Sequence, residues 1–260
     1  MHRTGDIPTP LTPDDVRRAK RERRRITALT AYDYPMARLL DESGVDVILV
    51  GDSLGMVVLG YEDTVPVTME DMLHHVRAAA RGVHRALLIG DLPARSYRTP
   101  AEAVDNARRL VDAGARAVKL EGGVAARAQI EAIVAAGVPI MGHVGMLPQS
   151  VREEGGYKVK GRSEVEALAL LDDARAVQEA GAFAVVLEIV APATAARLTA
   201  SLDIPTVGIG SGRGCDGQIL VTHDLIGLFP WFQPKFVTPR ATVAENIRAA
   251  VRGFVEETAG

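Results

Sequence analysis

Short apolar runs, rich in β-branched residues, alternate along the chain with longer stretches rich in Ala, Leu, Arg and Glu. The apolar runs cover residues 27–31, 45–50, 86–89, 117–120, 138–141, 184–189, 206–209 and 235–237. Because these runs are short and almost wholly apolar, they are typical of parallel strands buried on both faces. Eight strand-helix units in a chain of 260 residues favour a closed (β/α)8 TIM barrel over an open doubly wound sheet.

The stretches between the runs carry the start and stop signals of helices. Helices are expected over residues 35–43, 69–83, 101–113, 124–136, 164–180 and 243–257. Thr99-Pro100 joins an N-cap residue to a proline suited to the first helical turn. A glycine follows four of these helices, at Gly44, Gly114, Gly137 and Gly181, where a left-handed residue commonly ends a helix.

One domain is expected over residues 1–260, because no linker or low-complexity segment divides the chain. Residues 1–25 are expected to form an N-terminal extension and a helix that starts at Thr12-Pro13, followed by the barrel over residues 26–260. Residues 1–13 lack the apolar region of a secretory signal, and no apolar run approaches the roughly 20 residues of a membrane helix. The single cysteine, Cys215, excludes an intrachain disulfide. We therefore expect a soluble cytoplasmic protein without a membrane partner.

Charge and aromatic content argue against nucleic acid as a partner. The 30 basic and 33 acidic residues give a net charge of −3, without the basic excess of a nucleic-acid binder. Aromatic residues make up only 4% of the chain, which disfavours stacking on bases or sugars as the main activity. A small-molecule substrate is the expected partner.

Ionisable side chains follow most of the expected strands. In a TIM barrel the carboxyl ends of the strands meet at one rim, where the active site lies. The side chains expected at this rim are Asp52, Asp91, Lys119, Glu121, His143 and Glu188. A single residue of this kind would be interpreted as a solvated loop side chain, but six that converge on one rim indicate a site.

Asp52, Asp91 and Glu121 form a set of hard oxygen ligands, which suits Mg²⁺ better than Zn²⁺. The alternative is a structural ion-pair network of these acids with Lys119 and Arg95. Lys119 and Glu121 are two residues apart, so both side chains point to one face of the fourth strand. Opposite charges on one rim fit a bound metal beside an anionic group of a substrate.

Glu188 follows the apolar run 184–187 and precedes two further apolar residues. A carboxylate in this setting suits a general base, although a core glutamate held by an arginine or by backbone donors is the alternative. His143, alone at its strand end, is equally compatible with a structural role and with proton donation.

Two loops complete the candidate site. The glycine-rich segment 208–212 could cradle an anion or simply make tight turns, and it lacks the lysine of a nucleotide-binding P-loop. Cys215 has no neighbouring histidine in the sequence that would activate it as a nucleophile. The polar segment 149–160 is expected to be a lid over the site or an inert surface loop.

Six long motifs resemble the ketopantoate hydroxymethyltransferase family and occur in the family's order over about residues 26–235. They are TALTAYDYPMA from Thr27, GDSLGMVVLGYEDTVPVT from Gly51, VKLEGG from Val118, MGHVGMLPQS from Met141, GGYKVKGR from Gly155 and GIGSGRGCDGQILVTHD from Gly208. Motifs of this length are far more specific than an analogy of fold.

The resemblance implies a barrel of the phosphoenolpyruvate/pyruvate superfamily type and a homo-oligomer, commonly a decamer. It implies hydroxymethyl transfer from 5,10-methylenetetrahydrofolate to the 2-oxoacid 3-methyl-2-oxobutanoate, through a Mg²⁺-stabilised enolate, giving 2-dehydropantoate in pantothenate and coenzyme A biosynthesis. Carried over residue by residue, it implies Mg²⁺ ligation by Asp52, Asp91 and Glu121, substrate binding by Asp52, Ser53, Asp91 and Lys119, and proton acceptance by Glu188. A supporting role for His143 is expected only from its position at the rim.

The chain departs from the family pattern in two places. After Asp91 the family usually has Pro-Phe and a small residue before Ser-Tyr, whereas this chain has Leu-Pro-Ala-Arg-Ser-Tyr, which brings Arg95 near an expected metal ligand. Residues 238–241 replace a Lys/Arg-Arg-Tyr-Ala sequence and put the C-terminal packing in question. The alternative functions are a lyase or mutase of the same superfamily, which needs no folate, and a non-catalytic 2-oxoacid-binding protein.

Overall fold

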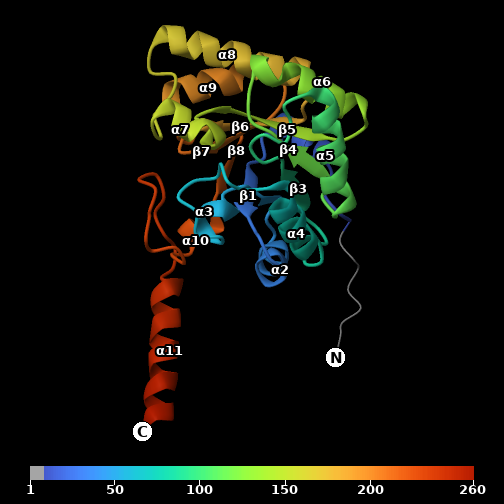
Figure 1. Ribbon diagram of the computed structural model, residues 1–260. Helices are drawn as coiled ribbons and strands as arrows, with labels where there is room; N and C mark the ends of the chain where they lie inside the picture. The colour runs from blue at the N-terminus through green and yellow to red at the C-terminus, as the bar shows by residue number, and fades with distance from the viewer. Residues whose placement is uncertain (1–8) are drawn as a thin grey trace. The chain divides into compact units, whose positions relative to one another are not determined.

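Eight parallel strands close into a barrel in the computed structural model, which describes residues 9–260 (Figure 1). In chain order they are β1 (Ile26–Thr30), β2 (Val47–Val50), β3 (Leu87–Asp91), β4 (Ala117–Lys119), β5 (Ile140–Gly145), β6 (Ala184–Glu188), β7 (Thr206–Ile209) and β8 (Gly217–Leu220). The (β/α)8 barrel and the helix before it are therefore confirmed.

The helices begin and end close to where the sequence signals place them. They are α1 (Pro13–Arg21), α2 (Tyr34–Glu42), α3 (Leu54–Val57), α4 (Met69–Ala80), α5 (Pro100–Asp112), α6 (Arg127–Ala135), α7 (Val151–Glu154), α8 (Glu164–Glu179), α9 (Pro192–Ser201), α10 (Thr222–Leu225) and α11 (Val243–Ala259), with 3-10 turns at Val124–Ala126 and Pro148–Ser150. Thr99 caps α5 by accepting a hydrogen bond from the Glu102 backbone N–H. The short helices α3, α7 and α10, and also α9, were not among the expected elements.

The eighth strand was predicted in the wrong place. Residues 235–237 form no strand, and β8 instead follows the glycine-rich loop and pairs Gly217 with Val207 of β7. A Cβ atom at Gly217 would lie 2.6 Å from the Ile26 carbonyl oxygen, so only glycine allows β8 to approach β1 this closely. Gly217 and Gln218 also weaken the apolar pattern, which is why the sequence did not indicate a strand there.

The barrel interior and the N-terminal helix share one apolar cluster. Alternate strand residues such as Leu87 and Ile89 point inward, whereas Leu88 belongs to the separate cluster between strands and helices. Val16 and Ala19 of α1 are buried in the inner cluster, so α1 packs against the barrel interior. This packing leaves the carboxyl ends of the strands available for chemistry.

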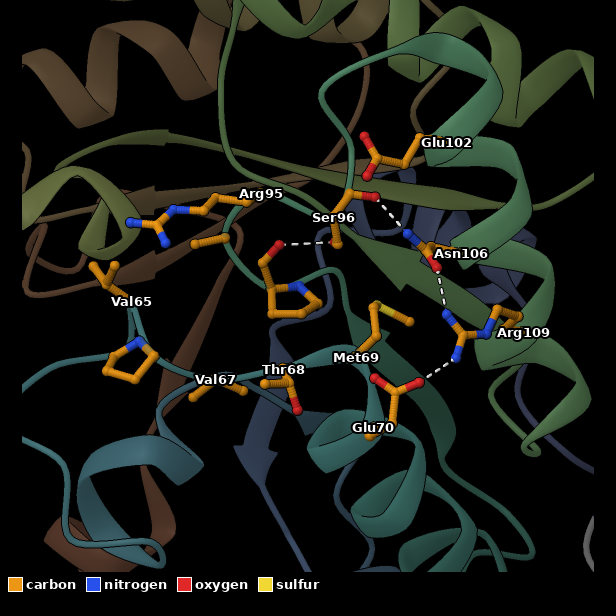
Figure 2. A pocket seen from close by; sticks show the side chains of 13 residues that line it. Val65, Val67, Thr68, Met69, Glu70, Arg95, Ser96, Glu102, Asn106 and Arg109 are labelled. Carbon is orange, nitrogen blue, oxygen red and sulfur yellow. Dashed lines mark hydrogen bonds and ion pairs between the residues drawn. The ribbon is translucent and has the colours of Figure 1, made fainter.

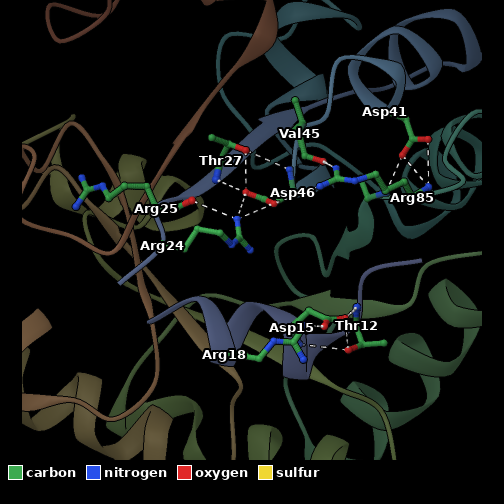
Figure 3. A network of polar contacts seen from close by, with 11 residues as sticks. Thr12, Asp15, Arg18, Arg24, Arg25, Thr27, Asp41, Val45, Asp46 and Arg85 are labelled. Carbon is green, nitrogen blue, oxygen red and sulfur yellow. Dashed lines mark hydrogen bonds and ion pairs between the residues drawn. The ribbon is translucent and has the colours of Figure 1, made fainter. Parts of the chain in front are cut away.

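Two buried carboxylates, Asp41 and Asp46, form hydrogen bonds to chain segments at the starts of β1 and β3 (Figure 3). Asp46 accepts hydrogen bonds from the backbone and hydroxyl of Thr27 and pairs with Arg24 at 3.0 Å. Asp41 accepts hydrogen bonds from three consecutive backbone N–H groups of residues 84–86. These carboxylates at the N-terminal ends of the strands stabilise the barrel on the side away from the candidate site.

Contacts divide the chain into two compact units, Met1–Ile219 and Leu220–Gly260. Within the second unit, the backbone N–H of Arg240 donates to Leu225 and that of Val243 donates to Ile226. The single domain expected over residues 1–260 stays a prediction, and residues 1–8 of the expected extension lie outside the described part. Across residues 9–260, no helix is both long and apolar enough to cross a membrane.

Candidate active site

Neighbouring strands bring the predicted site residues together at the carboxyl rim of the barrel. Asp91 ends β3 and is in register with Lys119, which ends β4. β5 runs further than predicted, so His143 lies within the strand and not after it. Glu188 ends β6 beside Gly145 of β5. The rigid strands thus fix both the acids and the cations of the site.

An almost fully buried ion pair joins Asp91 and Lys119, whose side chains are 1% and 5% exposed. The Lys119 Nζ atom lies 2.9 Å from Asp91 Oδ2. Burial opposes the charged ammonium, but the charges of Asp91, Glu121 and Asp52 outweigh it and raise the pKa of Lys119. Burial also raises the pKa of Asp52, and the neighbouring charges of Asp91 and Glu121 add to it. The three carboxylates therefore still repel one another beside Lys119, and an additional cation would relieve this repulsion.

His143 lies between two glutamates. Its Nδ1 atom is 3.4 Å from Glu121 Oε1, and its Nε2 atom is 3.2 Å from Glu188 Oε2. Burial and the Lys119 charge lower the pKa of His143, but contacts with Glu121 and Glu188 outweigh them and raise it to about 9. The imidazole is therefore cationic at neutral pH and links the acid cluster to Glu188.

Gln149, which the sequence analysis did not select, connects two of the carboxylates. Its Nε2 atom donates to Asp52 Oδ2 at 2.8 Å, and its backbone N–H donates to Glu121 Oε2 at 3.1 Å. The Tyr97 hydroxyl donates to Gln149 Oε1 at 2.5 Å and fixes the orientation of the amide. The sequence does not indicate this role, because the Gln149 side chain is neutral and the residue lies four positions beyond the end of β5.

Oxygens of the cluster that accept no hydrogen bond fit a hard cation. Asp91 Oδ1 is buried and accepts no hydrogen bond from residues 9–260, and the buried Glu121 Oε1 accepts none either, although His143 Nδ1 lies 3.4 Å from it. Leaving a buried polar atom unpaired costs about 1–3 kcal/mol, and more for a charged group. No three His, Cys, Asp or Glu side chains of the described chain can enclose a metal ion on their own. The set fits Mg²⁺, which one or two carboxylates commonly hold while water and substrate oxygens fill the other positions.

Ser53 lies at the start of α3, next to Asp52. Its Oγ atom is 2.8 Å from the hydroxyl of Tyr32, which is buried at the end of β1. The structure therefore places the predicted substrate-binding serine beside the acid cluster and fixes its side chain.

A strained turn follows Glu188. Ile189 has a φ of 48°, which is an outlier for a β-branched residue. The buried Ser211 stabilises this turn, because its Oγ donates to the Leu187 carbonyl at 2.7 Å and accepts from the Val190 N–H at 2.9 Å. The Glu188 side chain is 14% exposed and contacts His143, so its surroundings are less apolar than its neighbours in sequence imply. Part of the glycine-rich segment thus positions Glu188.

The segment after β5 reaches the candidate site. Arg152 of α7 makes two contacts with Asp63, at 2.6 and 3.1 Å. Gln149, the first residue of the segment, donates to Asp52 and Glu121. These contacts favour the lid interpretation of residues 149–160 over an inert loop.

The structure disfavours Cys215 as a nucleophile and a purely structural ion-pair network at the rim. Cys215 is fully buried, and burial raises the pKa of its thiol, which disfavours a nucleophilic role. The alternative ion-pair network is present only in part, because Lys119 pairs with Asp91 whereas Arg95 is exposed on the wall of a separate cavity.

Comparison with known proteins shows the family to which the chain belongs. Residues 10–260 match the family model described as ketopantoate hydroxymethyltransferase. The chain belongs to this family. A relative from Syntrophus aciditrophicus named 3-methyl-2-oxobutanoate hydroxymethyltransferase is 52% identical, over 95% of this chain and 92% of its own length. A relative of the same name from Carboxydothermus hydrogenoformans is 51% identical, over 95% of this chain and 90% of its own length.

Solved structures of much lower identity share the fold. Phosphonopyruvate hydrolase in complex with oxalate and Mg²⁺ is 17% identical, with a TM-score of 0.62 over 96% of this chain and 86% of that one. A 2,3-dimethylmalate lyase, described as a member of the PEP mutase/isocitrate lyase superfamily, is 18% identical, with a TM-score of 0.62 over 95% and 88% of the two chains. These structures confirm the barrel fold, while the relatives of about 50% identity carry the name of a hydroxymethyltransferase.

Replacing Ser211 by Ala should impair catalysis through Glu188. The change leaves the Leu187 carbonyl and the Val190 N–H without their partner, so we expect kcat to fall about tenfold with little change in the KM for the 2-oxoacid. The control is Ser201→Ala, which removes only a hydroxyl bond within α9. Adding Ile189→Gly to Ser211→Ala should restore part of the melting temperature, because glycine tolerates a positive φ. An unchanged kcat in Ser211→Ala would contradict this role.

Proposed function

We propose that the carboxyl rim of the barrel carries out the reaction of this family, hydroxymethyl transfer from 5,10-methylenetetrahydrofolate to 3-methyl-2-oxobutanoate. The reaction joins the one-carbon unit to C3 of the 2-oxoacid, consumes one water and releases tetrahydrofolate and 2-dehydropantoate, a precursor in pantothenate biosynthesis. The observation that supports this location best is the buried cluster of Asp52, Asp91 and Glu121 around Lys119, with Glu188 at its edge.

Asp52, Asp91 and Glu121 are the proposed holders of Mg²⁺, together with water and substrate oxygens, because the three side chains do not enclose an ion on their own. Support comes from the buried oxygens Asp91 Oδ1 and Glu121 Oε1, which accept no hydrogen bond, and from the repulsion among the three carboxylates. When bound, Mg²⁺ would polarise the ketone and stabilise the negative charge of the enolate. The phosphonopyruvate hydrolase that shares this fold was solved with Mg²⁺ and oxalate, a small dicarboxylate.

The remaining residues bind the substrate and move its proton. Lys119 supplies positive charge for the anionic head of the 2-oxoacid, and Ser53 offers a hydroxyl fixed by Tyr32. Glu188 accepts the C3 proton, and His143, 3.2 Å from its Oε2 atom, orients the carboxylate. The enolate carbon then forms a bond to the folate methylene carbon, the two carbon–nitrogen bonds to the folate break, and water supplies the hydroxyl oxygen of the product. The segment 149–160 excludes bulk water from the reactive carbanion while Arg152 is paired with Asp63.

A homo-oligomer is the proposed assembly, commonly a decamer in proteins that this chain resembles. The last helix, α11, buries no residue. Its larger apolar side chains Ile247, Val251, Phe254 and Val255 are 49–69% exposed and recur with helical spacing. A stripe of this kind is a surface for association, and a second copy of the chain is the proposed partner. A cytoplasmic location is also proposed, since the only cysteine is free and buried.

Activity should depend on a divalent cation held by the carboxylates. Treatment with a chelator should abolish turnover, and Mg²⁺ should restore it. Asp91→Asn should lower kcat/KM by a factor of a hundred or more, as loss of a major electrostatic contribution does. Asp33→Asn is the matched control, because this strand-end aspartate caps α2 and asparagine caps equally well. Normal turnover after chelation would contradict the metal site.

Glu188→Gln should separate deprotonation from binding. The amide keeps the size of the side chain but accepts no proton, so exchange of the C3 hydrogen in D₂O should fall by about a hundredfold or more. Binding of Mg²⁺ and 3-methyl-2-oxobutanoate, measured by calorimetry, should persist because the binding residues are unchanged. Exchange at the wild-type rate would place the base elsewhere, and His143 would be tested next.

The assembly is tested by its mass. Light scattering at micromolar protein should give a particle larger than a dimer. Val251→Asp and Phe254→Asp together should reduce that mass, because two charges would have to be desolvated at the contact, whereas the exposed Arg252→Ala should not. A monomeric wild-type mass would refute the proposed oligomer.

A further inference from the structure

A cavity of about 400 Å³ lies between the segment after β2 and the loop after β3, where no function has been assigned (Figure 2). Val65, Pro66 and Val67 line one side, and Pro93, Ala94 and Arg95 line another. Val65 is partly exposed and Pro66 is exposed, so apolar surface is accessible at the cavity wall. Thr68, Ser96 and Asn106 add polar groups, and the lining acids Glu70 and Glu102 are paired with Arg109 and Arg98. The accessible apolar side chains and the exposed Arg95 suit a ligand that has an aromatic part and a negative charge.

The cavity adjoins the proposed reaction site. Pro93 is two residues beyond Asp91, and the intervening Leu92 carbonyl accepts a hydrogen bond from the same Gln149 Nε2 that donates to Asp52. Four residues of extended chain span at most about 14 Å, so Arg95 lies within that distance of Asp91, measured between Cα atoms. A cosubstrate that reacts at the rim can therefore reach the cavity with its distal part.

The loop after β3 holds Arg95 in a strained conformation. Arg95 has a φ of 67°, in the left-handed region that side chains other than glycine rarely adopt. Both the backbone N–H and the hydroxyl of Ser96 donate to the Pro93 carbonyl, and Asn106 Nδ2 donates to the Ser96 carbonyl at 2.7 Å. Backbone strain that neighbouring bonds maintain is a common feature of ligand-binding positions.

The Arg95 guanidinium is free to pair with a ligand. Throughout residues 9–260 it has no hydrogen-bond or ion-pair partner, and in Figure 2 no contact joins it to the other lining residues. Arg109, on the same cavity, is instead paired with Glu70 and Asn106. Near the rim, Arg98 is paired with Glu102 and Arg152 with Asp63. Arg95 is thus the cation that this cavity offers to an anion.

We propose that this cavity binds the p-aminobenzoyl-glutamate part of 5,10-methylenetetrahydrofolate, with Arg95 pairing to a glutamate carboxylate; the inference rests on the proposed location of the reaction. The folate carbon must reach the rim near Glu188, so its tail has to follow a neighbouring surface. The valine and proline side chains of the cavity suit the benzoyl ring, and the unpaired Arg95 suits the carboxylates. Arg95 therefore discriminates for the glutamate tail and takes no part in the chemistry.

The test measures the KM of the wild-type enzyme and of Arg95→Gln, each with two cosubstrates. The cosubstrates are 5,10-methylenetetrahydrofolate and 5,10-methylenetetrahydropteroate, which lacks the glutamate. Arg95→Gln should raise the KM for the folate about five- to tenfold and leave kcat unchanged. This is the effect expected when a partly exposed, charge-assisted hydrogen bond to the glutamate carboxylate is lost. The same change should leave the KM for the pteroate unchanged. Arg162→Gln is the matched control, because Arg162 is exposed and does not line the cavity; it should change neither KM.

Equal effects of Arg95→Gln on both cosubstrates, or an effect on neither, would overturn the proposal. Exchange of the C3 hydrogen in D₂O needs no folate and should proceed at the wild-type rate in Arg95→Gln. If the KM comparison fails while C3 exchange is normal, the proposed folate cavity is wrong and the reaction site still stands. If C3 exchange does not require Glu188, the proposed reaction site itself is wrong.

Discussion

The buried ion pair between Lys119 and Asp91 is the interaction on which the candidate site depends. The Lys119 ammonium is buried among Asp52, Asp91 and Glu121, and its pairing with Asp91 offsets the loss of its hydration. Removing one member of a buried ion pair typically lowers the free energy of unfolding by about 3–5 kcal/mol. Two further carboxylates, Asp52 and Glu121, lie around the pair, and His143 lies 3.4 Å from Glu121. Repulsion among the three carboxylates, together with the buried Asp91 Oδ1 that accepts no hydrogen bond, fits the cation proposed for this site.

Neutral residues hold these charges in place. Gln149 donates to both Asp52 and Glu121 and begins the segment 149–160, so the position of this segment and the orientation of the acids are coupled. Ser211 does the same for Glu188 by bonding to the backbone on both sides of it, across the strained Ile189. Positioning of this kind, by rigid strands and fixed hydrogen bonds, is what an enolate-forming site requires.

Much of this architecture could be predicted from local patterns. The apolar runs, the caps at Thr12 and Thr99 and the glycines after helices depend on residues close in sequence, so they indicate a barrel directly. The eighth strand could not be predicted in this way. β8 requires glycine at position 217 because the chain there packs against the backbone of Ile26, almost two hundred residues earlier. Such a long-range contact has no signature in the neighbouring sequence.

For the site, the sequence by itself determined which charged residues reach the rim, since strand order and the alternation of side chains fix where Asp91, Lys119 and Glu188 lie. Tertiary structure alone decided their partners. The contacts of His143 with two glutamates, the contacts of Gln149 with two acids and the unpaired Arg95 beside a cavity all depend on how different strands and the loops after them meet. Such contacts depend on distances in space of a few ångströms, whereas a sequence records only the order of the residues that make them.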